Sequence, residues 1–235
     1  MPYKSITLYH NLHSLSIFFF NLLHLIKNAL IVPKGTQIKT GVEFMQEYIY
    51  LIVAQTGTKP AKFFRFFTRK PYNHVSLSGD INLSEMYSFC RTYTPFPLPA
   101  TFNREIVGKG TLGQFDYIPC EIYRIAVSHE QKEMYNQVIR HFANNRNIYS
   151  YNLLGLVAVY LNIQWKREYS FVCSQFVAYT MDKIGIKLEK PFCLYKPDDF
   201  RNFPDAQLIY SGELNHFYYD MQSRFTVSQR EKICH

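Results

Sequence analysis

Short runs in which apolar and polar residues alternate are distributed along the chain from about residue 47 onward. Each run has the two-residue period and the Ile, Val, Tyr or Phe content that are typical of a strand. Gly79, Asp80 and Asn82 separate two neighbouring runs and favour a hairpin between antiparallel strands. The predicted strands are residues 47–53, 74–78, 85–90, 121–127 and 206–210.

Other segments carry apolar residues at helical spacing. Ser128 and Gln131 form a capping-box signature at the start of one of them, and Gly185 ends another. The run 153–161 is apolar on nearly all sides and predicts a short buried helix. The predicted helices are residues 59–68, 129–144, 153–161 and 173–184, with a further turn at 197–200.

The amino-terminal region is apolar but interrupted by polar residues. Residues 12–32 have helical spacing, and no small-residue cleavage site precedes Pro33. We expect an amphipathic helix on its own domain, on a partner or on a membrane surface, followed by a linker at 33–41. The predicted organisation is residues 1–44 as helix and linker, 45–222 as the main domain, and 223–235 as a polar tail.

Proline and glycine mark irregular stretches in the middle of the chain. Pro95, Pro97 and Pro99 exclude regular structure over about ten residues. Three glycines between 108 and 113 predict a flexible loop before the strand at 121–127.

Composition narrows the class of protein. The chain has 235 residues, 47% of them hydrophobic, which is enough for one compact domain with a sizeable core. The net charge of +8 favours polyanions, but the basic residues are scattered and match no nucleic-acid-binding motif, so a solvated basic face is the preferred interpretation. Five cysteines without paired spacing predict neither a disulfide framework nor a metal site, and they favour a reducing compartment.

One cysteine, Cys173, lies where irregular chain changes into an amphipathic helix. The free amides and the dipole of a first helical turn stabilise a thiolate, and the same amides can bind an oxyanion. A cysteine nucleophile also needs an imidazole, and His74 at the start of a predicted strand is the candidate. The alternatives are a small buried cysteine on the apolar helix face and a structural histidine.

Four segments follow one another along the chain: Asn73-His74-Val75-Ser76-Leu77, Glu85-Met86-Tyr87-Ser88-Phe89, Tyr149-Ser150-Tyr151 and Val172-Cys173-Ser174-Gln175-Phe176-Val177. In this order they resemble the circularly permuted branch of the NlpC-type papain-like cysteine peptidase and amidase superfamily. In that branch a histidine on a strand precedes a cysteine that opens a helix. The resemblance implies an α+β, papain-like fold with an antiparallel sheet packed on helices, and it covers roughly residues 46–212. A later segment, Lys196-Pro197-Asp198-Asp199-Phe200, is also similar to the family's carboxy-terminal pattern.

The resemblance also implies a third residue that orients the imidazole, on the strand after His74. Tyr87 is nearest to the matching position, and Glu85 and Ser88 are the alternatives, although the family has a different polar residue there. The family's aromatic residue before the nucleophile helix corresponds to Tyr149 or Tyr151. Together with Ser174, these two tyrosines are the predicted substrate-binding or oxyanion residues, and packing against the short helix is the alternative for the tyrosines.

The leading hypothesis is a thiol hydrolase that cleaves an amide bond, such as that of a cell-wall peptide, and needs neither metal nor cofactor. The alternatives are a lipid-directed acyltransferase or thioesterase of the same fold and a binding module without catalysis. We expect a peptide, amide or acyl substrate, no specific nucleic acid, and peripheral membrane contact through residues 12–32. The expected location is cytoplasmic or membrane-associated, with secretion left open.

Overall fold

The computed structural model describes residues 46–57, 70–92 and 100–233. The chain divides into two compact units, Met1–Phe44 and Met45–His235, and every described residue belongs to the second unit. The predicted helices at 12–32 and 59–68 and the linker at 33–41 lie outside the described residues.

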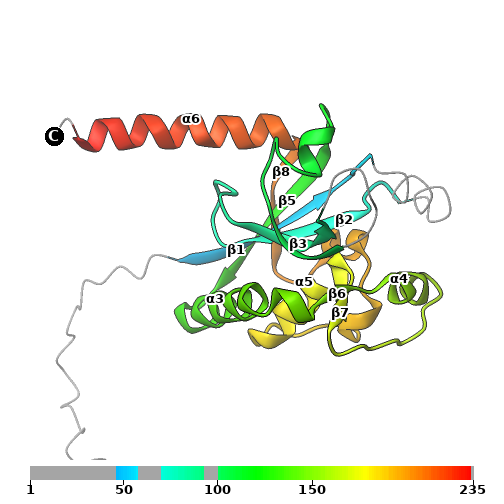
Figure 1. Cartoon of the computed structure of the whole chain (residues 1–235). Coiled ribbons are helices and arrows are strands. Elements are labelled where there is room, and N and C mark those ends of the chain that lie inside the picture. The colour runs from blue at the N-terminus through cyan, green and yellow to red at the C-terminus, as the bar shows by residue number, and fades with distance from the viewer. Residues whose placement is uncertain (1–45, 58–69, 93–99, 234–235) are drawn as a thin grey trace, which may run out of the picture. The chain divides into compact units, whose positions relative to one another are not determined.

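The second unit is an α+β structure built on one antiparallel sheet (Figure 1). Its strands follow the order β4-β3-β2-β1-β5-β8, and each neighbouring pair is antiparallel. A separate parallel pair joins β6 to β7. The strands are β1 (Glu47–Ala54), β2 (His74–Ser78), β3 (Met86–Arg91), β4 (Ala100–Glu105), β5 (Pro119–Val127), β6 (Ser150–Tyr151), β7 (Ser170–Phe171) and β8 (Ala206–Glu213).

Helices cover both faces of this sheet. Figure 1 shows α3, α4 and α5 on one side of the sheet and α6 on the other. The helices are α3 (His129–Asn144), α4 (Leu153–Tyr160), α5 (Cys173–Lys183) and α6 (Leu214–Ile233), and the short 3-10 turns are η1 (Leu112–Gln114), η2 (Arg146–Ile148), η3 (Phe192–Leu194) and η4 (Pro197–Asn202).

Strand β1 is central because both of its faces are apolar. Leu51 and Val53 belong to a core with α3 and α5, whereas Tyr50 and Ile52 belong to a second core on the opposite face. The second core also takes in the segment between β4 and β5 and the first turn of α6. A strand buried on both faces requires a nearly continuous apolar run, and β1 has one.

The core under α3 and α5 is mainly aromatic. Phe142 of α3 lies at its centre, with ring centroids of its neighbours 4.5 to 5.9 Å away. Ser128 fixes the start of α3 through the predicted capping box, because its hydroxyl accepts from the Gln131 N–H at 3.2 Å. The rings around Phe142 are Phe89, Phe102, Tyr149, Phe171, Phe176 and Tyr179.

Most predicted strands and helices within the described residues are confirmed, but the middle of the chain differs. Strand β4 begins directly after Pro99, in a stretch predicted to lack regular structure, because proline only removes a donor from the position it occupies. The glycine-containing loop that follows packs on the second core through Val107, Leu112 and Ile118, so it is not the free loop that was predicted.

Two further predictions are corrected. Helix α4 is buried on one side only: Gly155, Ala158 and Val159 are buried, whereas Leu153, Leu154 and, just after the helix, Leu161 are 53 to 65% exposed. An apolar composition alone predicted burial, but α4 lies at the edge of the helical layer with one face uncovered by described residues. The segment predicted as a polar tail continues α6 as far as Ile233, because Leu214 and Phe217 anchor the start of this helix.

We predict that Phe142→Ala lowers the free energy of unfolding by about 3 to 5 kcal/mol, because it opens a cavity among closely packed rings. Urea denaturation followed by circular dichroism measures this change. Phe225→Ala is the matched control, since Phe225 is 49% exposed on α6, and a change below about 0.5 kcal/mol is expected there. Equal effects of the two substitutions would contradict the central role of Phe142.

Candidate active site

Helix α5 begins at Cys173 without a capping side chain. The preceding residue, Val172, has only hydrocarbon in its side chain, and the Phe176 N–H is bonded to the Val172 carbonyl at 3.0 Å. The amides of Cys173 and Ser174 at the start of the helix therefore have no intrahelical acceptor. This arrangement leaves N–H donors and the positive end of the helix dipole beside a thiol.

The Gln175 side chain holds the beginning of α5 in place. It accepts a hydrogen bond from the Val172 N–H at 3.1 Å and donates one to the Cys193 carbonyl at 3.2 Å. The Asn152 side chain, at the start of α4, also donates to Gln175, at 3.5 Å. Since Gln175 is only 2% exposed, these bonds are shielded from water and fix Cys173 relative to α4 and η3.

His74 is the first residue of β2, and its imidazole is nearly buried. The His74 Nε2 atom lies 2.9 Å from Glu105 Oε1 and 3.1 Å from Glu105 Oε2, with the Ser76 hydroxyl at 3.2 Å. The side chains of His74 and Glu105 are 12% and 4% exposed. Cys173 lies close enough to His74 to raise the pKa of the imidazole. The structure thus aligns Glu105, His74 and Cys173.

The Glu105 carboxylate reaches His74 across an intervening strand. Strand β3 lies between β4 and β2, so the two outer strands are roughly 10 Å apart. On β3, Ser88 is fully buried and donates its hydroxyl to the Val75 carbonyl at 2.8 Å. A side chain as small as that of Ser88 leaves room for the carboxylate, which also accepts a hydrogen bond from the Ser76 hydroxyl.

Opposite charges determine the protonation of this pair. Burial acts to lower the pKa of His74, but the Glu105 carboxylate and the contacts with Cys173 outweigh it and hold the pKa well above 6.5. Burial likewise acts to raise the pKa of Glu105, but His74 and the hydrogen bonds from Ser76 and Cys90 lower it below 4.5. At neutral pH the pair is therefore an imidazolium and a carboxylate.

Two tyrosines lie close to Cys173. Burial, and then negative charge on Cys173, raises the pKa of Tyr151 well above 10.0. The same causes, followed by Asp199, raise the pKa of Tyr160 to about 12. Both hydroxyls therefore stay protonated at neutral pH and are potential donors to an oxyanion near Cys173.

A second thiol, Cys90, adjoins the same network. Burial raises its pKa well above 9.0, and the negative charges of Glu105 and Cys173 raise it further. Cys90 thus remains a protonated thiol and serves Glu105 as a hydrogen-bond partner.

The structure brings together His74, Cys173 and Tyr151 among the residues singled out from the sequence. Tyr87 does not take the orienting position, because it stacks on Phe102 at 5.4 Å on the face of the sheet that α3 covers. Glu85 lies in the turn before β3, and together with Tyr87 it lines a surface hollow beside α3. The carboxylate that contacts the His74 imidazole in the structure is that of Glu105.

The other predicted residues serve packing or secondary structure. Ser88 bonds to the backbone of β2, as described above, and Ser174 is buried in the first turn of α5. Tyr149 packs on Phe142 at 4.5 Å, and its hydroxyl lies 3.1 Å from His141 Nε2. Tyr149 is thus part of the aromatic core around Phe142 of α3, whereas the alternative considered for it was packing against the short helix at 153–161.

Sequence reasoning missed Glu105 and Tyr160. The proline run led to β4 being overlooked, and without β4 the pairing of Glu105 with the sheet could not be foreseen. A useful signal was the alternation of Ala100, Phe102 and Arg104 with Thr101, Asn103 and Glu105. Tyr160 was hidden in an apolar run that predicted only packing.

No model of a known protein family, no curated protein and no solved structure matches the chain. Within the described residues, no group of three or more His, Cys, Asp or Glu side chains is arranged to hold a metal ion. None of the helices in the same part of the chain combines the length and the hydropathy that a membrane span requires.

We predict that Glu105→Gln lowers the pKa of His74, because it removes the negative charge and leaves the effect of burial. Histidine NMR titration measures the shift, and Glu121→Gln is the matched control, since Glu121 is a buried carboxylate that pairs with Arg201 instead. An unchanged His74 pKa in Glu105→Gln would contradict the pairing.

The same pair sets a pH dependence of stability. The raised pKa of His74 contributes stability that is fully present below pH 6.5 and is lost as the pH rises through its folded-state pKa. The lowered pKa of Glu105 contributes stability that is present above pH 4.5 and is lost as the pH falls through its folded-state pKa. Both contributions are full between about pH 4.5 and 6.5, and Glu105→Gln removes them, which urea denaturation at several pH values tests.

Proposed function

We propose that the protein is a papain-like cysteine hydrolase of the permuted NlpC type that cleaves an amide bond. The observation that carries this proposal is the alignment of Glu105, His74 and Cys173 at an uncapped helix start. A thiol, an imidazole and an orienting carboxylate are the three parts of a nucleophilic triad. The antiparallel sheet with helices packed on it agrees with this class of fold.

Each group has a role in the proposed reaction. Glu105 and Ser76 occupy His74 Nε2, which leaves Nδ1 to exchange a proton with Cys173. The thiolate attacks the carbonyl carbon, and the amides of Cys173 and Ser174, with the Tyr151 hydroxyl beside them, bind the oxyanion. The amine leaves with the proton from the imidazolium, and a thioester remains on Cys173.

Water completes the cycle. His74 takes a proton from a water molecule, which attacks the thioester carbonyl. The carbon–sulfur bond breaks, the carboxylic acid product leaves, and the sulfur regains its proton from the imidazolium. No metal or cofactor takes part in these steps.

We predict that iodoacetamide modifies Cys173 faster than any other cysteine at pH 6, and that His74→Ala slows this reaction about 100-fold or more. Peptide mass spectrometry identifies the modified residue, and Cys90 is an internal reference because it stays protonated. His141→Ala is the matched control, since His141 contacts Tyr149 away from Cys173. Labelling at Cys173 no faster than at Cys90, and insensitive to His74, would favour a binding module instead of an enzyme.

One observation favours a second candidate, a lipid-directed acyltransferase or thioesterase that uses the same three residues. Helix α4 and the chain after it expose large apolar side chains, and α4 ends at Tyr160 beside Cys173. Lys166 and Arg167 come directly after Trp165 and are exposed. Their positive charges complement an anionic lipid surface. The exposed apolar residues are Leu153, Leu154, Val157, Leu161, Ile163 and Trp165.

We predict for this candidate that the full chain sediments with phosphatidylcholine vesicles containing phosphatidylglycerol. Leu154→Ser combined with Leu161→Ser weakens vesicle binding at least about tenfold, since each substitution removes apolar area from the membrane contact. Leu208→Ser is the control, because Leu208 is 50% exposed on β8, away from α4. If the wild type stays in solution with these vesicles, the lipid-directed candidate is overturned.

A further inference from the structure

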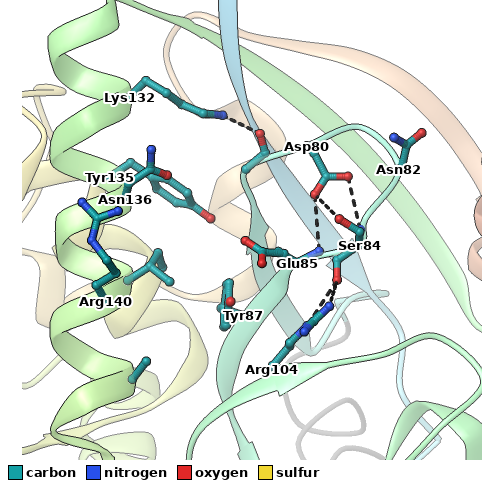
Figure 2. Close-up of a pocket in the computed structure, with 13 residues that line it drawn as sticks. Asp80, Asn82, Ser84, Glu85, Tyr87, Arg104, Lys132, Tyr135, Asn136 and Arg140 are labelled. Atoms are coloured by element: carbon teal, nitrogen blue, oxygen red, sulfur yellow. Dashed lines mark hydrogen bonds between the residues drawn. The ribbon is translucent and has the colours of Figure 1, made fainter.

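A polar hollow lies between α3 and the turn that joins β2 to β3 (Figure 2). Its volume is about 520 Å³, which is large enough for a small molecule. It adjoins Gly79, which follows the last residue of β2, whereas His74 is the first residue of that strand. On β4, Arg104 lines the hollow and Glu105 points to the opposite face of the sheet, so the hollow is separate from the catalytic residues.

Several polar groups of the hollow are already paired with the protein. The Asp80 carboxylate accepts hydrogen bonds from the Ser84 N–H and hydroxyl and from the Glu85 N–H, at 2.8 to 3.3 Å. Arg104 donates to the Ser84 carbonyl, at 2.6 and 3.2 Å. Lys132 donates to the Tyr48 and Gly79 carbonyls. These bonds hold the walls of the hollow in place.

The Tyr135 hydroxyl is buried without any hydrogen-bond partner among the described residues. Tyr135 is only 3% exposed, and burial, followed by the charges of Tyr87, Asp80 and Glu85, raises its pKa far above 10.0. Figure 2 shows the hydroxyl pointing toward the Glu85 carboxylate across the hollow. An unpaired buried hydroxyl is unfavourable, so a ligand that hydrogen-bonds to it is stabilised at this position.

Two further side chains with oxygen atoms line the hollow near Tyr135. The Glu85 carboxylate and the Tyr87 hydroxyl line the same hollow, and neither has a side-chain hydrogen bond in the described ranges. The negative charge of Glu85 reaches both tyrosines, because it raises the pKa of each after burial has done so. One carboxylate and two hydroxyls match a primary ammonium group, which has three N–H donors and one positive charge.

Arg140 supplies the opposite charge. It lines the hollow one turn of α3 after Asn136, and within the described residues it forms no ion pair. A guanidinium in this position suits a carboxylate or a phosphate, both of which accept two parallel hydrogen bonds. The hollow therefore presents an acidic group and a basic group to one small molecule.

We propose that this hollow binds a small zwitterion with a primary ammonium group, which contacts Glu85, Tyr87 and Tyr135, and an anionic group, which contacts Arg140. An amino acid and phosphoethanolamine share this chemistry. Because the residues involved are separate from Cys173 and His74, this binding does not depend on the proposed hydrolase activity.

Isothermal titration calorimetry on the full chain tests the proposal with L-alanine, O-phosphoethanolamine, ethanolamine and phosphocholine. We expect saturable binding of L-alanine or O-phosphoethanolamine. The ligand with the higher affinity shows whether the site prefers a carboxylate or a phosphate as the anionic group. We expect weaker binding of ethanolamine, which lacks the anion, and none of phosphocholine, which lacks N–H donors. Absence of saturable binding by both zwitterions, or equal binding of phosphocholine, would overturn the proposal.

Variants assign the contacts. Tyr135→Phe and Glu85→Gln each weaken binding at least about tenfold, because each removes a partner of the charged ammonium group. Tyr135→Phe keeps the ring and deletes only an unpaired hydroxyl, so its thermal stability without ligand does not fall. Arg140→Gln weakens zwitterion binding but leaves ethanolamine binding unchanged.

Tyr117→Phe is the control, since Tyr117 is 68% exposed outside the hollow, and it leaves all affinities unchanged. Affinities that are insensitive to Tyr135→Phe and Glu85→Gln would overturn the assignment of the hollow. Equal loss of zwitterion and ethanolamine binding in Arg140→Gln would overturn the proposed contact with the anion.

Discussion

The Glu105 carboxylate is a charge buried inside the sheet, and the arrangement around it follows from the need to compensate that charge. A buried carboxylate is stable only with an opposite charge and with hydrogen bonds to its remaining lone pairs. His74 supplies the charge, and Ser76 and Cys90 supply hydrogen bonds. Because these partners lie on β2 and β3, the pairing requires β4, β3 and β2 to be adjacent in that order.

The position of Cys173, the proposed nucleophile, depends on a different part of the structure. Helix α5 is buried on nearly all sides, and its Phe176 packs among the rings around Phe142. Gln175 fixes the first turn of α5 through hydrogen bonds to Val172 and Cys193. The aromatic core therefore brings Cys173 to His74, while the charged network orients His74, so that apolar packing and electrostatics each supply one part of the candidate active site.

The two faces of β4 connect the candidate active site with the polar hollow. Glu105 points to His74, and its neighbour Arg104 lines the hollow on the opposite face. A shift of β4 by one residue would exchange the two side chains and leave a guanidinium beside His74. The register of β4 against β3 is set by six residue pairs, among them Phe89 with Phe102 in the aromatic core. Core packing thus fixes the position of both charges.

The sequence alone determined the elements that depend on local patterns. The nearly continuous apolar run of β1 and the capping box at Ser128 each specify a structure within a few neighbouring residues, and so does the start of an amphipathic helix at Cys173. Cys173 and His74 could be named because each lies at the start of such an element. The pairing of Glu105 with His74, the placement of Tyr160 and the exposure of α4 were decided only by the tertiary structure. These features depend on which strands and helices, remote along the chain, become neighbours, and the local period of apolar residues carries no information about that choice.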